Sequence, residues 1–196
     1  MQKPISAEDI RKIYPEPKDL VRNAHAPCLE DSTQRFISAS TFVLFSSINS
    51  DGFIDITPRG GPAGFIKVID NKNIAFLNEM GNNKVHTLFN LSENNKVGIM
   101  FIIPGVTDIV RAYGTAVASS DEGFIESIGG NLKRNKTAIQ IEIVKVFPHC
   151  STALNRSSLW QQEKWPDTDV LNIPDVREMA EALTTHRVNL ESNDKG

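Results

Sequence analysis

Short strand-like runs separated by turn residues fill the middle of this chain and constrain its fold more than any other feature. Between Phe36 and Pro148, β-branched, aromatic and aliphatic residues come in short stretches broken by Gly, Asn, Asp and Pro. This sequence pattern is typical of strands joined by turns. It predicts seven strands, at residues 42–49, 53–57, 65–70, 74–78, 96–103, 109–118 and 137–147. The stretches 50–52 and 70–73 have hairpin-turn chemistry, so their neighbouring strands should pair antiparallel, which argues against a doubly wound parallel sheet.

Less regular segments flank this central region. Ser6 is a plausible N-cap for a helix over residues 7–13, and Pro174 and Asp175 supply start signals for another over 176–187. A chain of 196 residues with 40% hydrophobic residues suits one core with appendages. We therefore predict a helical lead-in packed on the core at 1–35, a β domain at 36–165, and a C-terminal helix with a flexible tail at 166–196.

Charge and composition exclude several functional classes. The formal net charge is -3 and no cluster of five or more Lys or Arg occurs, so nucleic acid is not expected as a partner. No apolar run reaches the roughly 18 residues of a membrane span, and the N-terminus lacks the apolar stretch of a signal peptide. We expect a cytoplasmic protein without a membrane partner. Cys28 and Cys150 are far apart, so free thiols and no metal site are expected.

The stretch from Asn78 to Lys84 is the most informative candidate site. It lies between a predicted strand and a predicted amphipathic helix over residues 82–93, whose apolar face would carry Val85, Leu88 and Phe89, with Asn90 on another face. A helix N-terminus presents unpaired N–H groups and partial positive charge, which favours phosphate. The alternative, of about equal weight, is that Asn82 only caps the helix and Lys84 is solvated.

A second candidate stretch, residues 55–62, places Arg59 between a proline and two glycines. The proline holds the chain extended, and the glycines clear the space beside the arginine. The guanidinium could then reach a planar or phosphorylated ligand. On residue types alone, a surface hairpin is the better interpretation of this stretch.

Together these stretches resemble a known family. The segments FVLFSSINSDGFIDITPRGG, GFIKVID, IAFLNEMGNNK and HTLFNLSENNKVGIMFIIPGV occur in the family's order, followed by residues 108–114 and 147–160. They resemble the pyridoxamine 5′-phosphate oxidase-like FMN proteins, in the subgroup with an SPRG-type motif. The resemblance spans about residues 36–165, which is most of the chain.

The resemblance implies a mainly β fold with flanking helices: a six- or seven-stranded antiparallel split β-barrel of the FMN-binding type. It also implies a homodimer with one FMN in each of two clefts between the subunits. Arg59 and Gly60 would lie along the flavin, and Asn78, Asn82, Asn83 and Lys84 would hold the ribityl chain and phosphate. Arg111, Arg156 and Trp160 would reach the same or the partner's cofactor, although Trp160 suits a dimer-packing role slightly better.

Two departures from the family pattern bear on activity. Thr57 stands where the motif usually has serine, and Gly61 stands where an aspartate is usual. True pyridoxamine 5′-phosphate oxidases bind their substrate with a set of Arg, Tyr and His side chains. The full set is not found in this sequence, which argues against that substrate.

The resemblance implies an FMN-dependent oxidoreductase. Such an enzyme would pass electrons from a reduced donor, for example NAD(P)H, to a small acceptor or oxygen, with the redox chemistry on the flavin and no catalytic residue assigned in the chain. The rival hypothesis is a non-catalytic protein that binds or senses flavin or haem on the same barrel. A third is a dimer that has lost its cofactor. Hydrolysis has little support, because GxSxG is absent.

Overall fold

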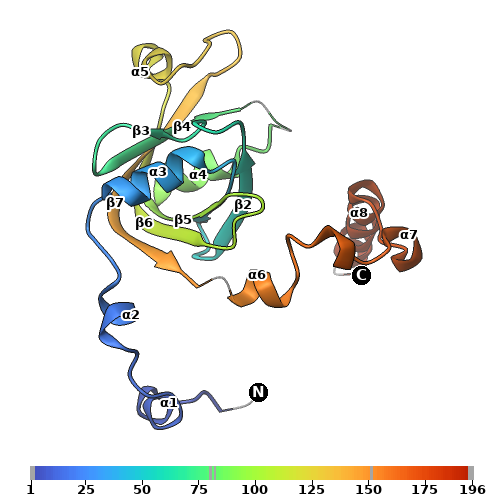
Figure 1. Ribbon diagram of the computed structural model, residues 1–196. Helices are drawn as coiled ribbons and strands as arrows, with labels where there is room; N and C mark the ends of the chain where they lie inside the picture. The colour runs from blue at the N-terminus through green and yellow to red at the C-terminus, as the bar shows by residue number, and fades with distance from the viewer. Residues whose placement is uncertain (1–2, 80, 82, 151, 194–196) are drawn as a thin grey trace.

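One curled, seven-stranded antiparallel sheet forms the body of the protein in this computed structural model (Figure 1). The structure describes residues 3–79, 81, 83–150 and 152–193. The strand order is β2-β1-β5-β6-β7-β4-β3, and every pair of neighbours is antiparallel. The strands are β1 (Phe42–Ile48), β2 (Ile54–Gly60), β3 (Lys67–Val68), β4 (Asn73–Asn78), β5 (Lys96–Ile102), β6 (Ile109–Ser119) and β7 (Thr137–His149). The sheet is not closed between β2 and β3, so the predicted mainly β split-barrel fold is confirmed.

The predicted hairpins are confirmed, and one strand is shorter than predicted. Strand β1 pairs with β2 from Phe42 opposite Gly60 to Ile48 opposite Ile54, and β3 pairs with β4. Strand β3 has two residues instead of the six predicted at 65–70. At its C-terminal end, an Asp70 carboxylate oxygen accepts hydrogen bonds from the backbone N–H groups of Lys72 and Asn73, at 2.7 and 2.8 Å. The end of the predicted strand, at Asp70, therefore belongs to this turn and not to β3.

Alternating burial on the central strands builds the core. Val43 and Phe45 of β1 are fully buried, and the Phe45 ring meets Phe76 of β4 edge-on at 5.6 Å between centroids. Ile37 of helix α3 (Asp31–Ala39) and Leu91 of helix α4 (His86–Glu93) join the same cluster. These contacts explain why both helices pack against the sheet, since burial of a large apolar side chain stabilises the fold by roughly 1.5–3 kcal/mol.

A bulge lies between the two longest strands. The register of β6 against β7 shifts between Tyr113 and Gly114. A Cβ at Gly114 would lie 1.9 Å from the Glu142 carbonyl oxygen, so only glycine allows the strands to approach this closely.

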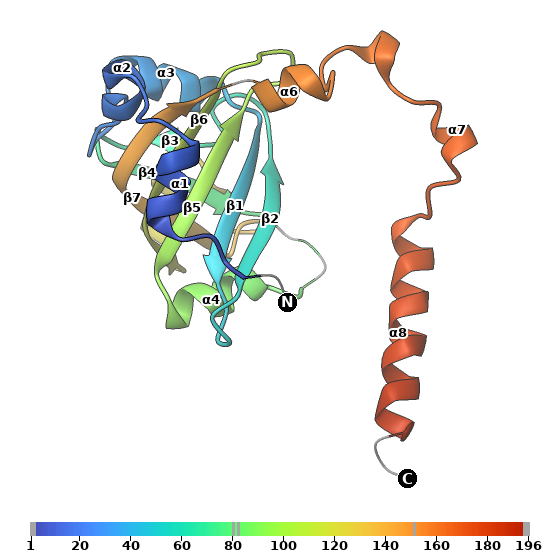
Figure 2. The same cartoon turned by 90° about the horizontal axis from the view of Figure 1, so that it is seen from below.

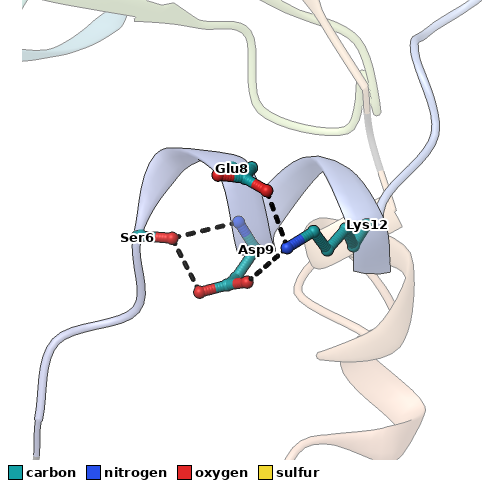
Figure 3. A network of polar contacts seen from close by, with 4 residues as sticks. All are labelled: Ser6, Glu8, Asp9 and Lys12. Carbon is teal, nitrogen blue, oxygen red and sulfur yellow. Dashed lines mark hydrogen bonds and ion pairs between the residues drawn. The ribbon is translucent and has the colours of Figure 1, made fainter.

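The N-terminal segment carries helices α1 (Ala7–Ile13) and α2 (Asp19–Asn23), neither of which has a buried residue. The predicted cap is confirmed, because Ser6 Oγ accepts from the Asp9 N–H at 3.1 Å (Figure 3). Lys12 forms ion pairs with Glu8 and Asp9 at 2.8 and 3.2 Å. The segment meets the barrel at Ala26, which bridges to Val146 of β7, and at the buried Leu29. The domain limits at residues 35 and 165 stay predictions.

The C-terminal segment leads away from the barrel. It contains α6 (Thr152–Arg156), a 3-10 turn (Gln162–Lys164), α7 (Thr168–Leu171) and α8 (Val176–Asn193). Figures 1 and 2 both show α8 standing apart from the sheet. Helix α8 continues six residues beyond the predicted end at Arg187, because residues 188–193 contain no Gly or Pro to stop it. The flexible tail was predicted to begin at residue 191, but residues 191–193 are helical, and 194–196 lie outside the described residues. In the described part of the chain, no helix has the length and apolar character of a membrane span.

Candidate functional site

A cleft of about 1170 Å³ brings the two predicted site stretches together. Its walls come from the end of β2 and the glycine-rich segment after it, the end of β4 with the loop that follows, the first turn of α4, and the connection into β7. Five predicted site residues line it: Arg59, Gly60, Asn78, Asn83 and Lys84. Asn82 was predicted with them but lies outside the described residues.

The loop between β4 and α4 differs from the prediction. The helix begins at His86 rather than at residue 82, so Asn83 and Lys84 lie in a loop ahead of it. Asn83 and Val85 have φ angles of 59° and 43°, in the left-handed region. Asparagine tolerates this region, but a β-branched valine adopts it only at a cost in energy. Residues held in such a conformation concentrate at ligand sites, and this pair borders the cleft.

Arg59 projects inward from β2 and contacts α4. Burial alternates along β2, so that Asp55, Thr57 and Arg59 face inward. Arg59 Nη2 donates to Thr87 Oγ1 at 3.0 Å, and Nη1 donates to the Pro58 carbonyl at 2.9 Å. Burial lowers the pKa of Arg59. The guanidinium remains cationic at neutral pH, because an arginine pKa normally exceeds about 12.

A buried asparagine forms a second contact between α4 and the sheet. Asn90 was predicted on a face away from the apolar one, but its side chain is only 6% exposed, whereas Phe89 is 65% exposed. Asn90 Nδ2 donates to Ser47 Oγ at 2.9 Å and to Asp55 Oδ2 at 2.7 Å. The face of α4 toward the sheet therefore carries Thr87, Asn90 and Leu91. The sequence pattern does not reveal this face, because the polar residues Thr87 and Asn90 occupy its buried helical positions at i and i+3.

The glycine at position 61 is explained by its neighbour Phe65. A Cβ at residue 61 would lie 2.8 Å from the Phe65 Cβ, so any side chain there would displace the ring. The aspartate that the family motif usually carries does not fit this backbone.

The connection from β6 to β7 forms a wall that the sequence analysis did not single out. Helix α5 (Glu122–Ser127) precedes a loop, and from this connection Ile128, Gly129, Lys133, Lys136 and Thr137 line the cleft. Asn135 in the loop is 5% exposed, and its Nδ2 donates to Glu79 Oε1 at 3.1 Å. This hydrogen bond ties the loop to the end of β4 across 56 residues of sequence.

The charge of the cleft is opposite in sign to that of the chain. Its described lining includes five cationic side chains and a single carboxylate: Arg59, Lys67, Lys84, Lys133 and Lys136 against Glu79. The whole chain carries a formal charge of -3. The positive charge concentrated here favours an anionic ligand.

Three predicted site residues lie outside this cleft. Arg111 of β6 stacks over the Phe147 ring at 4.6 Å, and its Nε atom is buried without a hydrogen-bond partner in the structure. Trp160 Nε1 donates to the Val106 carbonyl at 3.0 Å. Arg156 lies on α6 and is exposed. Within one copy of the chain, these residues do not meet the cleft that Arg59 and Lys84 line.

Arg111 belongs to an exposed apolar face on the outside of the sheet, called here the outer face. Strand register places Pro58, Leu44, Met100 and Arg111 in one row across β2, β1, β5 and β6. The remaining members of the face are Ile54, Ile56 and Tyr113. Ile54 and Ile56 are 67% and 65% exposed, which is unusual for large aliphatic side chains on a strand.

Comparisons with known proteins agree with this architecture. The family model described as pyridoxamine 5′-phosphate oxidase matches residues 29–150, which contain the whole sheet from Phe42 to His149. The chain therefore belongs to the pyridoxamine 5′-phosphate oxidase family. The SPRG-type subgroup stays a prediction. A search of curated proteins found no match.

Solved structures resemble the fold at low sequence identity. HupZ from Group A Streptococcus has a TM-score of 0.52 and 16% identity, covering 63% of this chain and 95% of that chain. An FMN-binding protein from Syntrophomonas wolfei has a TM-score of 0.44 and 19% identity, covering 72% of this chain and 95% of that chain. The HupZ comparison supports the fold alone.

Proposed function

We propose that this protein is an FMN-dependent oxidoreductase that passes electrons from a reduced donor, a nicotinamide nucleotide, to a small acceptor or oxygen. The observation that carries the proposal is the cleft of this chain, which belongs to the family. Cationic side chains and the glycine-rich end of β2 line the cleft together. Its volume of about 1170 Å³ is ample for a mononucleotide, since ligand pockets usually measure about 300–1,000 Å³.

The side chains present fit a phosphorylated, planar ligand. Lys84 and Asn83 border the cleft in a loop in which Asn83 and Val85 adopt left-handed backbone conformations. They would hold the phosphate, because a lysine ammonium and amide groups donate charge-assisted hydrogen bonds to it. Gly60 and Gly61 leave the neighbouring surface without side chains, which suits a flat ring.

Arg59 would supply positive charge beside that ring. Its guanidinium is oriented by Thr87 and Pro58, so little conformational entropy is lost when a ligand binds. Bound FMN supplies the hydride and electron chemistry of the reaction. The chain's own contribution is to bind and orient, and a fixed cation at Arg59 favours negative charge next to it.

The proposed assembly is a homodimer formed through the outer face. Ile54, Ile56 and Tyr113 lie exposed there, and Arg111 Nε is buried without a partner in a single copy. A second copy would cover the apolar side chains, and a two-fold axis would present the same face from both copies. We assign Arg111, Arg156 and Trp160, which do not line the cleft of their own chain, to the dimer contact or to the partner's cofactor.

The proposal is tested by the visible spectrum of the FMN-loaded protein, recorded before and after NADH or NADPH is added without oxygen. Bleaching of the flavin bands, and their return when air is admitted, is the expected result. A flavin spectrum that neither donor bleaches would support the rival function of flavin binding or sensing. A protein that takes up no FMN would contradict the cofactor assignment.

A further inference from the structure

We propose that the cleft contains a second anion-binding subsite, formed by Lys67, Lys133 and Lys136, that takes the diphosphate of a nicotinamide dinucleotide donor. We call these three side chains the basic wall. The inference rests on the proposed function, because it assigns a substrate class to the same cleft. It is separate from the Asn83–Lys84 loop, to which the FMN phosphate is assigned.

The basic wall is drawn from two elements that lie on either side of β4, namely β3 and the connection into β7. Lys67 on β3 pairs with Ala75 of β4, and Ala75 packs in one cluster with Ile125 and Ile128 of the connection that carries Lys133. Lys136 directly precedes Thr137, which pairs with Asn78 at the end of β4. All three lysines line the cleft.

The loop that carries Lys133 and Lys136 has a fixed backbone. Asn135 is almost fully buried, its Oδ1 accepts from the Asn131 N–H at 3.0 Å, and its Nδ2 reaches Glu79. A Cβ on Gly130 would lie 2.4 Å from the Ile125 side chain, so the loop entry is tightly packed. Lys136 Nζ donates to the Leu132 carbonyl at 2.7 Å, which leaves further N–H donors on that ammonium.

Among the described residues, no carboxylate forms an ion pair that would neutralise the basic wall. No ion pair within the described residues involves Lys67, Lys133 or Lys136. Glu79 is the one carboxylate in the described lining, and one of its oxygens already accepts from Asn135. Three uncompensated ammonium groups in a concave surface attract a polyanion, and that attraction weakens with salt.

The cleft is larger than an ordinary single-ligand pocket. Its volume of about 1170 Å³ lies above the usual upper end of about 1,000 Å³. A donor that carries a diphosphate would place two negative charges on the basic wall while its nicotinamide approaches the flavin. A neutral donor would form no ionic contact with these lysines.

The test compares the double variant Lys133→Gln/Lys136→Gln with a control, Lys72→Gln/Lys96→Gln, which removes two exposed lysines outside this cleft. Inorganic pyrophosphate is titrated into each FMN-loaded protein by calorimetry, and KM and kcat are measured with NADPH. The double variant should bind pyrophosphate about tenfold more weakly and show a similar rise in KM, as expected for lost hydrogen bonds to charged groups. Its kcat and its Kd for FMN should match those of the control.

Unchanged pyrophosphate affinity and unchanged KM in the double variant would overturn the inference. An equal loss of FMN affinity would also overturn it, because the lysines would then belong to the flavin phosphate site. Loss of affinity for FAD, with pyrophosphate and NADPH unaffected, would assign the basic wall to the second phosphate of a flavin dinucleotide and overturn the donor site. Because pyrophosphate binding needs no turnover, failure of the oxidoreductase proposal remains distinguishable from failure of this one.

Discussion

The two sides of strand β2 show opposite chemistry. Its inward side carries Asp55, Thr57 and Arg59, all polar, whereas its outward side carries Ile54 and Ile56, which are more than half exposed. A strand on a solvated sheet normally places apolar residues inward and polar residues outward. This reversal indicates that packing in the core does not by itself explain the residues on either side of β2. Thr57 and Arg59 of the inner side line the cleft, which we propose binds the ligand, and we propose that the outer side faces a second copy of the chain.

A charge placed on the outer face should have the largest effect. We expect Ile56→Lys to abolish the dimer at micromolar concentration, because the symmetric interface buries two unpaired ammonium groups at a cost of several kcal/mol each. Light scattering coupled to size exclusion measures the mass. The control is Ile69→Lys, which adds a charge at an exposed isoleucine near the β3–β4 turn and should leave the dimer intact. A wild-type monomer, or a dimeric Ile56→Lys protein, would contradict the assignment of the outer face.

Removing a positive charge from the cleft should weaken FMN binding and leave the dimer intact. We expect Lys84→Ala to weaken FMN binding by roughly 1.5–3 kcal/mol, the value for a hydrogen bond to a charged group. Quenching of flavin fluorescence measures the Kd. Lys96→Ala, which removes an exposed lysine outside the cleft, is the control and should bind normally. Equal affinities for the two variants would show that Lys84 does not hold the phosphate.

A smaller change should follow when the orientation of Arg59 is disturbed. Thr87→Val keeps the shape of the side chain but removes the hydroxyl that accepts from Arg59 Nη2 at 3.0 Å. We expect FMN affinity to fall by roughly 0.5–1.5 kcal/mol, the net value of one hydrogen bond. Thr87→Ser, which retains the hydroxyl, should restore most of the affinity. If valine and serine variants bind alike, the hydroxyl does not position the arginine.

The smallest expected effect concerns His149, near Arg111 at the end of β7. Burial, and then the positive charge of Arg111, lower the pKa of His149. Its neutral form is therefore favoured in the folded state, so its contribution to stability is lost as pH falls below the pKa of the unfolded chain. Arg111→Gln should raise the pKa of His149, as followed by an NMR titration assigned with His149→Gln. An unchanged pKa would show that the two groups do not interact.

The sequence predicts the sheet well because its signals are local. Alternating apolar residues and hairpin turns located all seven strands, but β3 was predicted two residues too long at each end, with Asp70 closing a turn at its C-terminal side. The start of α4 was wrong because the helical pattern does not reveal that Asn83 and Val85 adopt left-handed conformations. The buried Asn90 and the bond between Glu79 and Asn135 join distant parts of the chain, so no local pattern reports them.

The affinities of the unloaded protein for FMN and for riboflavin, which differ only in the phosphate, test directly whether the cleft recognises that phosphate. We expect FMN to bind at least about tenfold more tightly, since charge-assisted hydrogen bonds to the phosphate contribute about 1.5 kcal/mol or more. This preference should shrink as salt is added. Equal affinity for FMN and riboflavin would show that the cationic cleft does not recognise a flavin phosphate.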